Sequence, residues 1–197
     1  MPGNADPTTD ERAQLLGFLA QQRDLFRNAA YGLTDEQART TPSASALSIG
    51  GLVKHASTTE AGWVDTMLQR PPRDTAAGII AYQEQFTMRA DETLAALFER
   101  WDAIASETEE AAGSVGLLDP VPVPRDQPWF PVDIEAWNVR WVLLHLLEEL
   151  SRHAGHADIV RESIDGATGY ELMAGREGWP KTDWLTPWQP PGSEPAT

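Results

Sequence analysis

The chain has 197 residues, no cysteine, and a net charge of −15 from 15 Lys+Arg against 30 Asp+Glu. This length fits one domain with a sizeable core, and the lack of cysteine excludes a disulfide framework, a thiolate metal site and a cysteine nucleophile. The acidity argues against nucleic acid and against an anionic membrane as partners. Residues 1–10 lack the pattern of a secretory signal, and no apolar run is long enough to span a membrane. We therefore expect a cytoplasmic protein.

Proline divides the chain into segments that should be helical. The stretches 8–41, 43–70, 73–119 and 132–179 contain no proline, whereas the breaks between them do. Proline lacks a backbone N–H and clashes with the preceding turn, so helix interiors avoid it. Four proline-free segments therefore predict four helices.

Each of these segments also carries apolar residues at a helical period of about 3.6. Almost no two-residue alternation is present, so the chain is predicted to be an all-α bundle. Ser48 is a candidate N-cap for the second helix, and Gly166 suits the end of the fourth. In chain order, the expected helices are Asp10–Ala30, Ile49–Met67, Ile79–Ile104 and Asn138–Ile164.

The remaining segments differ in character. Residues 1–9 are expected to be a disordered N-terminus, 10–170 the bundle, and 171–197 a C-terminal tail that is partly packed on the bundle. Residues 114–131, just before the last helix, hold five prolines together with Trp129 and Phe130. A connection of this length in a compact domain is more often functional than idle.

Two polar residues interrupt the apolar stripe of the last helix. Glu149 and His153 occupy positions where the period calls for core side chains. Burying a carboxylate and an imidazole is costly unless they are paired or coordinate a metal. Residues four apart on a helix lie about 5–6 Å apart at Cβ, so both can reach one cation. His55 on the second helix is a third candidate, because bundles often combine ligands from facing helices.

Two interpretations of these residues remain open at this point. Two histidines and one carboxylate are typical of a catalytic site for zinc or another first-row divalent ion. An i,i+4 ion pair also explains Glu149 and His153 fully. We expect His145 to be packed or hydrogen-bonded. His156 is a candidate partner of a ligating histidine, a substrate contact or a purely structural residue. Glu148 and Arg152 should form an exposed i,i+4 pair.

The segments LSIGGLVKH (47–55) and WVLLHLLEELSRHAGHADIVRESIDG (141–166) together resemble the DinB-like superfamily, and more narrowly its subfamily related to mycothiol-dependent enzymes. The resemblance covers most of residues 10–170. It implies an up-down-down-up four-helix bundle with a long crossover between the second and third helices. By position it implies His55, Glu149 and His153 as metal ligands, with Glu149 standing where many relatives carry histidine. His156 stands where many relatives carry glutamine, which makes it a candidate for lining the site.

The resemblance also implies a function. Members of the superfamily are often S-transferases that use mycothiol, bacillithiol or a related small thiol. We therefore expect a metal-dependent transferase that joins a mycothiol-like thiol to a small electrophile, with zinc as the first choice of metal and nickel, iron or manganese as alternatives. Arg125, Trp129 and Phe130 from the long loop, with His156, are the predicted substrate contacts. The chain could also form a homodimer.

Two other functions fit the same sequence. The first is a metal-dependent hydrolase or isomerase that activates water on the metal. The second is a non-catalytic, stress-associated protein in which the metal braces the bundle.

Overall fold

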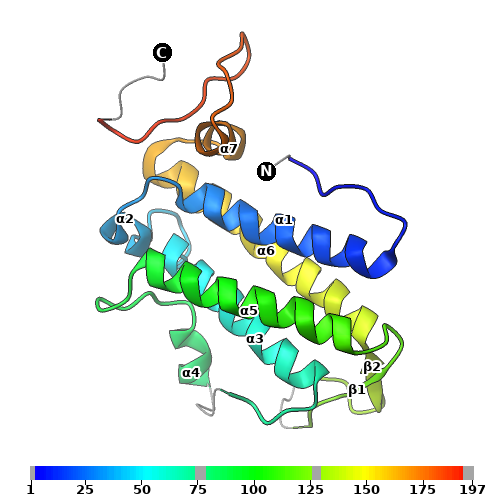
Figure 1. Ribbon diagram of the computed structural model, residues 1–197. Coiled ribbons are helices and arrows are strands. Elements are labelled where there is room, and N and C mark those ends of the chain that lie inside the picture. The colour runs from blue at the N-terminus through cyan, green and yellow to red at the C-terminus, as the bar shows by residue number, and fades with distance from the viewer. Residues whose placement is uncertain (1–2, 74–78, 126–129, 193–197) are drawn as a thin grey trace.

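The computed structural model describes residues 3–73, 79–125 and 130–192, and its main feature is a bundle of four long helices. In Figure 1, α1 and α6 run in one direction and α3 and α5 in the other, which is the predicted up-down-down-up order. The all-α prediction is confirmed. The long helices are α1 (Glu11–Ala30), α3 (Ile49–Met67), α5 (Leu94–Ser114) and α6 (Val139–Asp165); the short ones are α2 (Asp35–Arg39), α4 (Ile79–Glu84) and α7 (Gly169–Glu177).

The long helices begin at residues whose side chains cap the first turn. Ser48 accepts a hydrogen bond from the Gly51 amide at 3.1 Å, as predicted for the start of α3. Asn138 does the same for α6, accepting from the Trp141 amide at 2.9 Å. These bonds satisfy N–H groups that have no partner inside the helix. Gly166 ends α6 with φ 79°, a left-handed conformation that glycine adopts readily, and this prediction is also confirmed.

The prediction of one continuous helix over Ile79–Ile104 is wrong. The chain leaves the helix after α4, residues 85–93 turn, and α5 begins at Leu94. Lys54 holds this turning segment by donating to the Thr87 carbonyl and to the Glu92 carboxylate, both at 3.0 Å. Arg39 donates to the carbonyl of Arg89 at 3.0 Å. These tertiary bonds engage backbone carbonyls that a continuous helix would have used for its own ladder.

A buried ionic cluster interrupts the apolar core of the bundle. Glu60 on α3 is fully buried and accepts hydrogen bonds from Arg23 at 2.6 and 3.1 Å. The indole of Trp101 donates to Glu60 at 2.8 Å, and the hydroxyl of Thr108 donates at 2.6 Å. A buried carboxylate is tolerated when it is paired and its oxygens are hydrogen-bonded. The cluster therefore joins α1, α3 and α5 at a fixed point.

The long connection before α6 contains a small antiparallel hairpin. Its strands are β1 (Pro120–Pro122) and β2 (Ala136–Asn138), with Val121 opposite Trp137. The guanidinium of Arg125 donates to the carbonyls of Pro131 at 3.0 Å and Ile134 at 2.8 Å. Arg125 therefore braces its own loop. The hairpin brings Trp137 to the start of α6, at the end of the bundle away from α7 (Figure 1).

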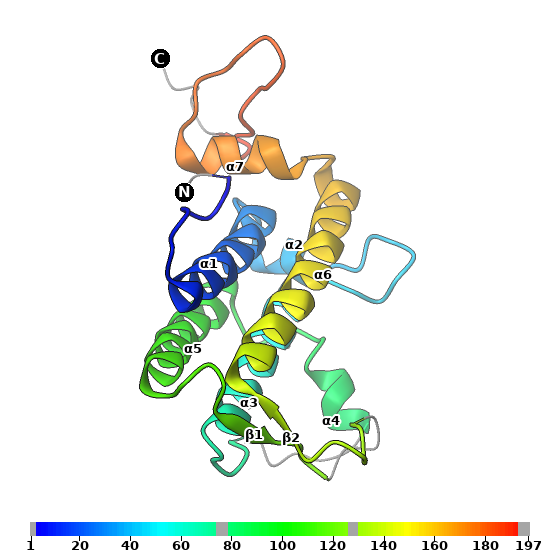
Figure 2. The ribbon, with the colours of Figure 1, turned by 90° about the vertical axis from the view of Figure 1, so that its right-hand side faces the viewer.

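Helix α7 lies across the other end of the bundle, where it packs on α1 (Figure 2). The chain that follows returns to the bundle at Trp188, whose ring lies 4.5 Å from the guanidinium carbon of Arg161. A Cβ on Gly175 would meet the Trp188 carbonyl oxygen at 1.9 Å, so this close approach requires glycine. Across the described ranges, no helix combines the length and apolar character needed to cross a membrane.

Candidate metal centre

The structure brings His55, Glu149 and His153 together. Their donor atoms all lie within 4.8 Å of one another. His153 Nε2 is 3.4 Å from Glu149 Oε2, and the His55 and His153 rings meet edge to face with centroids 4.7 Å apart. The i,i+4 spacing on α6 aligns two donors, and the packing of α3 on α6 supplies the third. Three donors from two helices thus converge on one point.

His55 is the most constrained of the three residues. It is 4 % exposed, and its Nδ1 makes no hydrogen bond of normal geometry among the described residues, although the nearby Gln85 side chain acts to raise its pKa. Its Nε2 lies 3.5 Å from the Thr59 hydroxyl. Burial, and then the nearby His153, lower the pKa of His55 from 6.5 to about 4. His55 is therefore neutral at pH 7, with a buried nitrogen that would cost about 1–3 kcal/mol if left without a partner.

Glu149 complements the two imidazoles with negative charge. Its side chain is 31 % exposed, and a hydrogen bond with His153 is the main cause that lowers its pKa. The carboxylate is therefore ionised at neutral pH. Two imidazoles and one carboxylate are donors that zinc and other first-row divalent ions accept. An ion pair between Glu149 and His153 accounts for those two residues, but it leaves the buried His55 nitrogen unexplained.

The other two histidines of α6 have different surroundings. His156 Nδ1 lies 3.4 Å from His153 Nδ1, so the two ring nitrogens of His153 face Glu149 on one side and His156 on the other. His145 is packed, as expected: it stacks on Trp141 at 5.1 Å and meets the edge of Trp63 at 4.7 Å. Its Nδ1 is 3.5 Å from Glu148. His156 is thus placed to orient His153. His145 belongs to an aromatic cluster, one helical turn before Glu149.

The turn that interrupts the expected third helix covers the centre. The ring of Phe86 stacks on His55 with centroids 3.8 Å apart and planes inclined by 19°. A Cβ on Gly51 would lie 2.0 Å from the Phe86 carbonyl oxygen, and one on Gly50 would lie 2.2 Å from the Met88 sulfur. Only glycine allows residues 85–93 to approach α3 this closely. The apolar period gave no sign that Phe86 would cover His55, and the Gly50–Gly51 pair about one turn before His55 was the available signal.

The loop residues predicted to contact substrate, Arg125, Trp129 and Phe130, have separate outcomes. Phe130 lines a cavity of about 850 Å³ together with Trp137, Trp141 and His145. His145, one helical turn before Glu149, is the lining residue that comes nearest in sequence to the candidate donors on α6. Arg125 is engaged by its own loop carbonyls. Trp129 lies outside the described residues.

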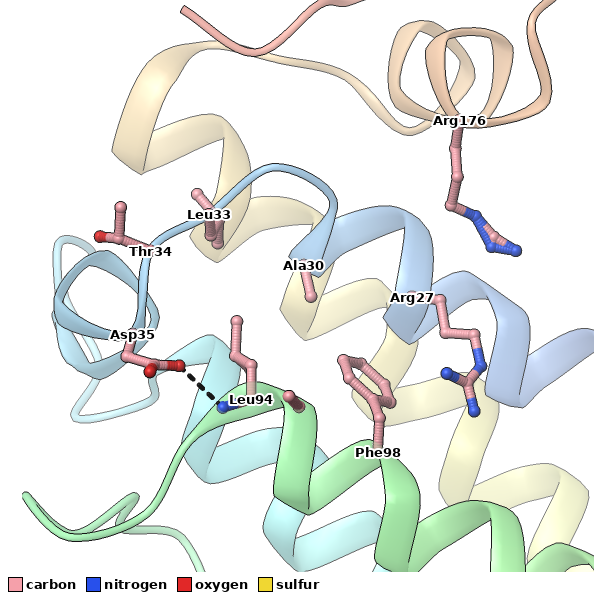
Figure 3. A pocket seen from close by; sticks show the side chains of 9 residues that line it. Arg27, Ala30, Leu33, Thr34, Asp35, Leu94, Phe98 and Arg176 are labelled. Atoms are coloured by element: carbon pink, nitrogen blue, oxygen red, sulfur yellow. Dashed lines mark hydrogen bonds between the residues drawn. The ribbon is translucent and has the colours of Figure 1, made fainter.

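A second cavity of about 730 Å³ lies between α1, α2, α5 and α7 (Figure 3). Its charged side chains have structural partners. Arg27 pairs with Asp102 and lies over the Phe98 ring at 4.7 Å, and Arg176 donates to Asn28 at 3.0 Å. Asp35 accepts from the Leu94 amide at 2.8 Å, which caps α5. These bonds join the helices and leave this cavity without an evident chemical role.

The exposed ion pair on α6 agrees with the sequence. Arg152 and Glu148 lie 3.6 Å apart, with side chains 65 % and 64 % exposed. This prediction is confirmed, and the pair provides solvent-facing residues directly beside Glu149 and His153 in the sequence of α6.

Two comparisons with known proteins identify first the fold and then the family of this chain. A conserved protein from Enterococcus faecalis, known from a crystal structure, superposes with a TM-score of 0.63 at 13 % identity, covering 81 % of this chain and 100 % of that one. This likeness shows the fold. No curated protein matches the sequence. The sequence model of the mycothiol-S-transferase family matches residues 14–166, which include α1 from Gln14 onward, the other three long helices and the three donors. The chain therefore belongs to the mycothiol-S-transferase family of DinB-like proteins.

Proposed function

We propose that this protein is a metal-dependent transferase that joins a small mycothiol-like thiol to an electrophilic small molecule. His55, Glu149 and His153 would hold the metal, for which zinc is the first candidate. The observation that carries the proposal is the buried Nδ1 of His55, which makes no hydrogen bond of normal geometry among the described residues and belongs to a neutral ring grouped with two further donors. A divalent cation held there would favour the thiolate form of a bound thiol at neutral pH.

The surrounding residues supply orientation and exclusion of water. His156 faces the Nδ1 of His153 and would keep that ring turned toward Glu149, as outer partners of metal-bound histidines commonly do. Phe86 covers the His55 ring and shields one side of the centre from solvent. The chain contains no cysteine, so the sulfur that forms the new carbon–sulfur bond must come from a separate thiol. A cytoplasmic location, where small thiols are kept reduced, is part of the same proposal.

The metal assignment is tested first by changing one ligand and its neighbour. Glu149→Gln keeps the size of the side chain and removes its charge, so we expect metal affinity to fall by more than about 100-fold, the upper end of what outer-partner changes cost. Glu148→Gln is the matched control, because Glu148 is adjacent and 64 % exposed. Metal content is measured by elemental analysis, and helix content by circular dichroism. Full metal occupancy in Glu149→Gln would move the assignment to His145 or His156.

The reaction class is tested by its need for thiol. We expect turnover of an electrophile such as 1-chloro-2,4-dinitrobenzene to require both a thiol and the metal, and to stop when a chelator removes the metal. Mycothiol and bacillithiol should be compared with glutathione, because glycosidic thiols carry hydroxyl groups that glutathione lacks. Metal-dependent turnover at the same rate without any thiol would favour the hydrolase or isomerase alternative. Metal binding without turnover of any substrate would favour the stress-associated protein.

A further inference from the structure

An aromatic wall stands at the start of α6. Trp137, Trp141 and His145 follow one another at intervals of four residues, and their rings stack with centroids 4.4 and 5.1 Å apart and planes inclined by 1° and 12°. Trp63 on α3 meets all three from the side, at 5.4, 5.7 and 4.7 Å. Such contacts hold each ring in place. The wall is therefore a rigid surface of parallel rings.

The cavity of about 850 Å³ is bounded by this wall and by the apolar side chains of Phe130 and Ile134. Its size is within the range of about 300–1,000 Å³ that small-molecule sites occupy. Two of its large apolar side chains reach solvent, since Trp141 is 37 % and Ile134 42 % exposed. Exposing these apolar side chains to water does not stabilise the monomer. The cavity thus has the size and the apolar lining of a binding site.

The charges around the cavity restrict its ligand. None of its described lining residues is Asp, Glu, Lys or Arg, and His145 is its one titratable group. The chain carries a net charge of −15. A carboxylate or phosphate would lose its hydration there without gaining a cationic partner. A ligand of this cavity should therefore be neutral. Parallel rings also favour a flat ligand that can stack or meet their edges, rather than a puckered aliphatic one.

The position of the cavity connects it to the candidate metal centre. His145 at the end of the wall precedes Glu149 by one helical turn, a rise of about 5.4 Å. Both side chains lie on the same face of α6, because residues four apart are neighbours on a helix surface. A ligand held against His145 would therefore lie about one helical turn from Glu149.

From these observations we propose that the cavity lined by Trp137, Trp141 and His145 binds the electrophilic substrate, and that this substrate is a neutral, planar aromatic molecule. The assignment of the ligand as the electrophile rests on the proposed transferase function. The binding of neutral planar molecules rests only on the cavity. The two statements can therefore be tested separately.

The binding test uses the neutral fluorescent probe N-phenyl-1-naphthylamine, with the full-length protein, in the presence of a chelator and without thiol. We expect the probe to bind the wild type and to bind Trp141→Ala about tenfold more weakly, since an aromatic stacking partner is lost. Trp184→Ala is the matched control, because Trp184 is 76 % exposed on the tail and lies outside the cavity lining. Circular dichroism checks folding. Trp141→Leu, which keeps apolar bulk without a ring, replaces Trp141→Ala if that variant does not fold.

The charge and shape of the ligand are tested by displacement of the probe. We expect 1-chloro-2,4-dinitrobenzene to displace it, and 2,4-dinitrobenzoate and chlorocyclohexane to displace it at least tenfold less well. Probe binding that is absent, unchanged in the Trp141 variants, or displaced equally by the benzoate would overturn the inference while leaving the metal and thiol tests unaffected. If thiol-dependent turnover is absent for every electrophile although the probe binds as expected, the proposed function fails and the cavity loses its role as the electrophile site.

Discussion

The lowered pKa of His55 predicts a specific pH dependence of stability in the metal-free protein. In the unfolded chain this imidazole binds its proton near pH 6.5, but in the folded protein only near pH 4. Between these values the unfolded state binds more protons, so the free energy of unfolding falls as the pH falls. Proton linkage with these two pKa values gives a loss of about 2 kcal/mol at pH 5 relative to pH 8.

Replacing His55 with glutamine should remove this contribution. The assay is urea unfolding of the wild type and of His55→Gln at pH 8, 6.5 and 5, with a chelator present throughout. We take the difference in the free energy of unfolding between the two proteins at each pH, so that contributions from other titrating groups cancel. This difference should change by about 2 kcal/mol over the series. The lowest pH is 5, because at lower pH the protein would approach its isoelectric point of about 4.5. A difference that stays constant with pH would show that His55 titrates alike in both states and would refute the argument from burial.

Three further variants test other parts of the structure. Burial, and then Glu162, raise the pKa of Asp158 to about 6 from 3.8; its ionised form is thus disfavoured in the folded state, and Asp158→Asn should be up to about 3 kcal/mol more stable at pH 8 in urea unfolding, with the gain vanishing below pH 4. His156→Ala should lower zinc affinity by about 10–100-fold in a chelator competition assay, because His153 loses its outer partner; unchanged affinity would reject that role. Glu60→Gln should cost up to about 3–5 kcal/mol of stability, because the remaining carboxylate near Arg23 is then Glu109, which is 3.6 Å away and 55 % exposed; a cost below about 1 kcal/mol would show that the cluster is not ionic.

Local patterns in the sequence predicted the elements that depend on neighbouring residues. The bounds of α1, α3 and α6, the Ser48 cap and the Gly166 stop were predicted to within about two residues, because proline, capping side chains and the 3.6-residue period act over one or two turns. The grouping of Glu149 with His153 followed from the same local spacing. Adding His55 to this pair depended on the expectation that two helices face each other and on the resemblance to a family. The apolar period of a helix does not show which other helix it contacts.

Other features depended on contacts between residues far apart in the chain. The apolar period over Ile79–Ile104 has the spacing of a single helix, yet Lys54 and Arg39 bind the carbonyls of residues 87 and 89 and hold a turn there. The period reports only which residues are apolar, so it could not show that Phe86 would leave the helix and cover His55.

The buried charge of Glu60 and the aromatic wall also depend on contacts between residues far apart in the chain. The partners of Glu60 come from 37, 41 and 48 residues away in the chain. Trp63 is on α3, whereas Trp141, which it contacts in the wall, is on α6. Local sequence patterns determined α1, α3 and α6 and placed Glu149 and His153 on one face of α6. Tertiary packing decided what surrounds those donors, because burial, stacking and ion pairing across the bundle arise only when distant segments meet.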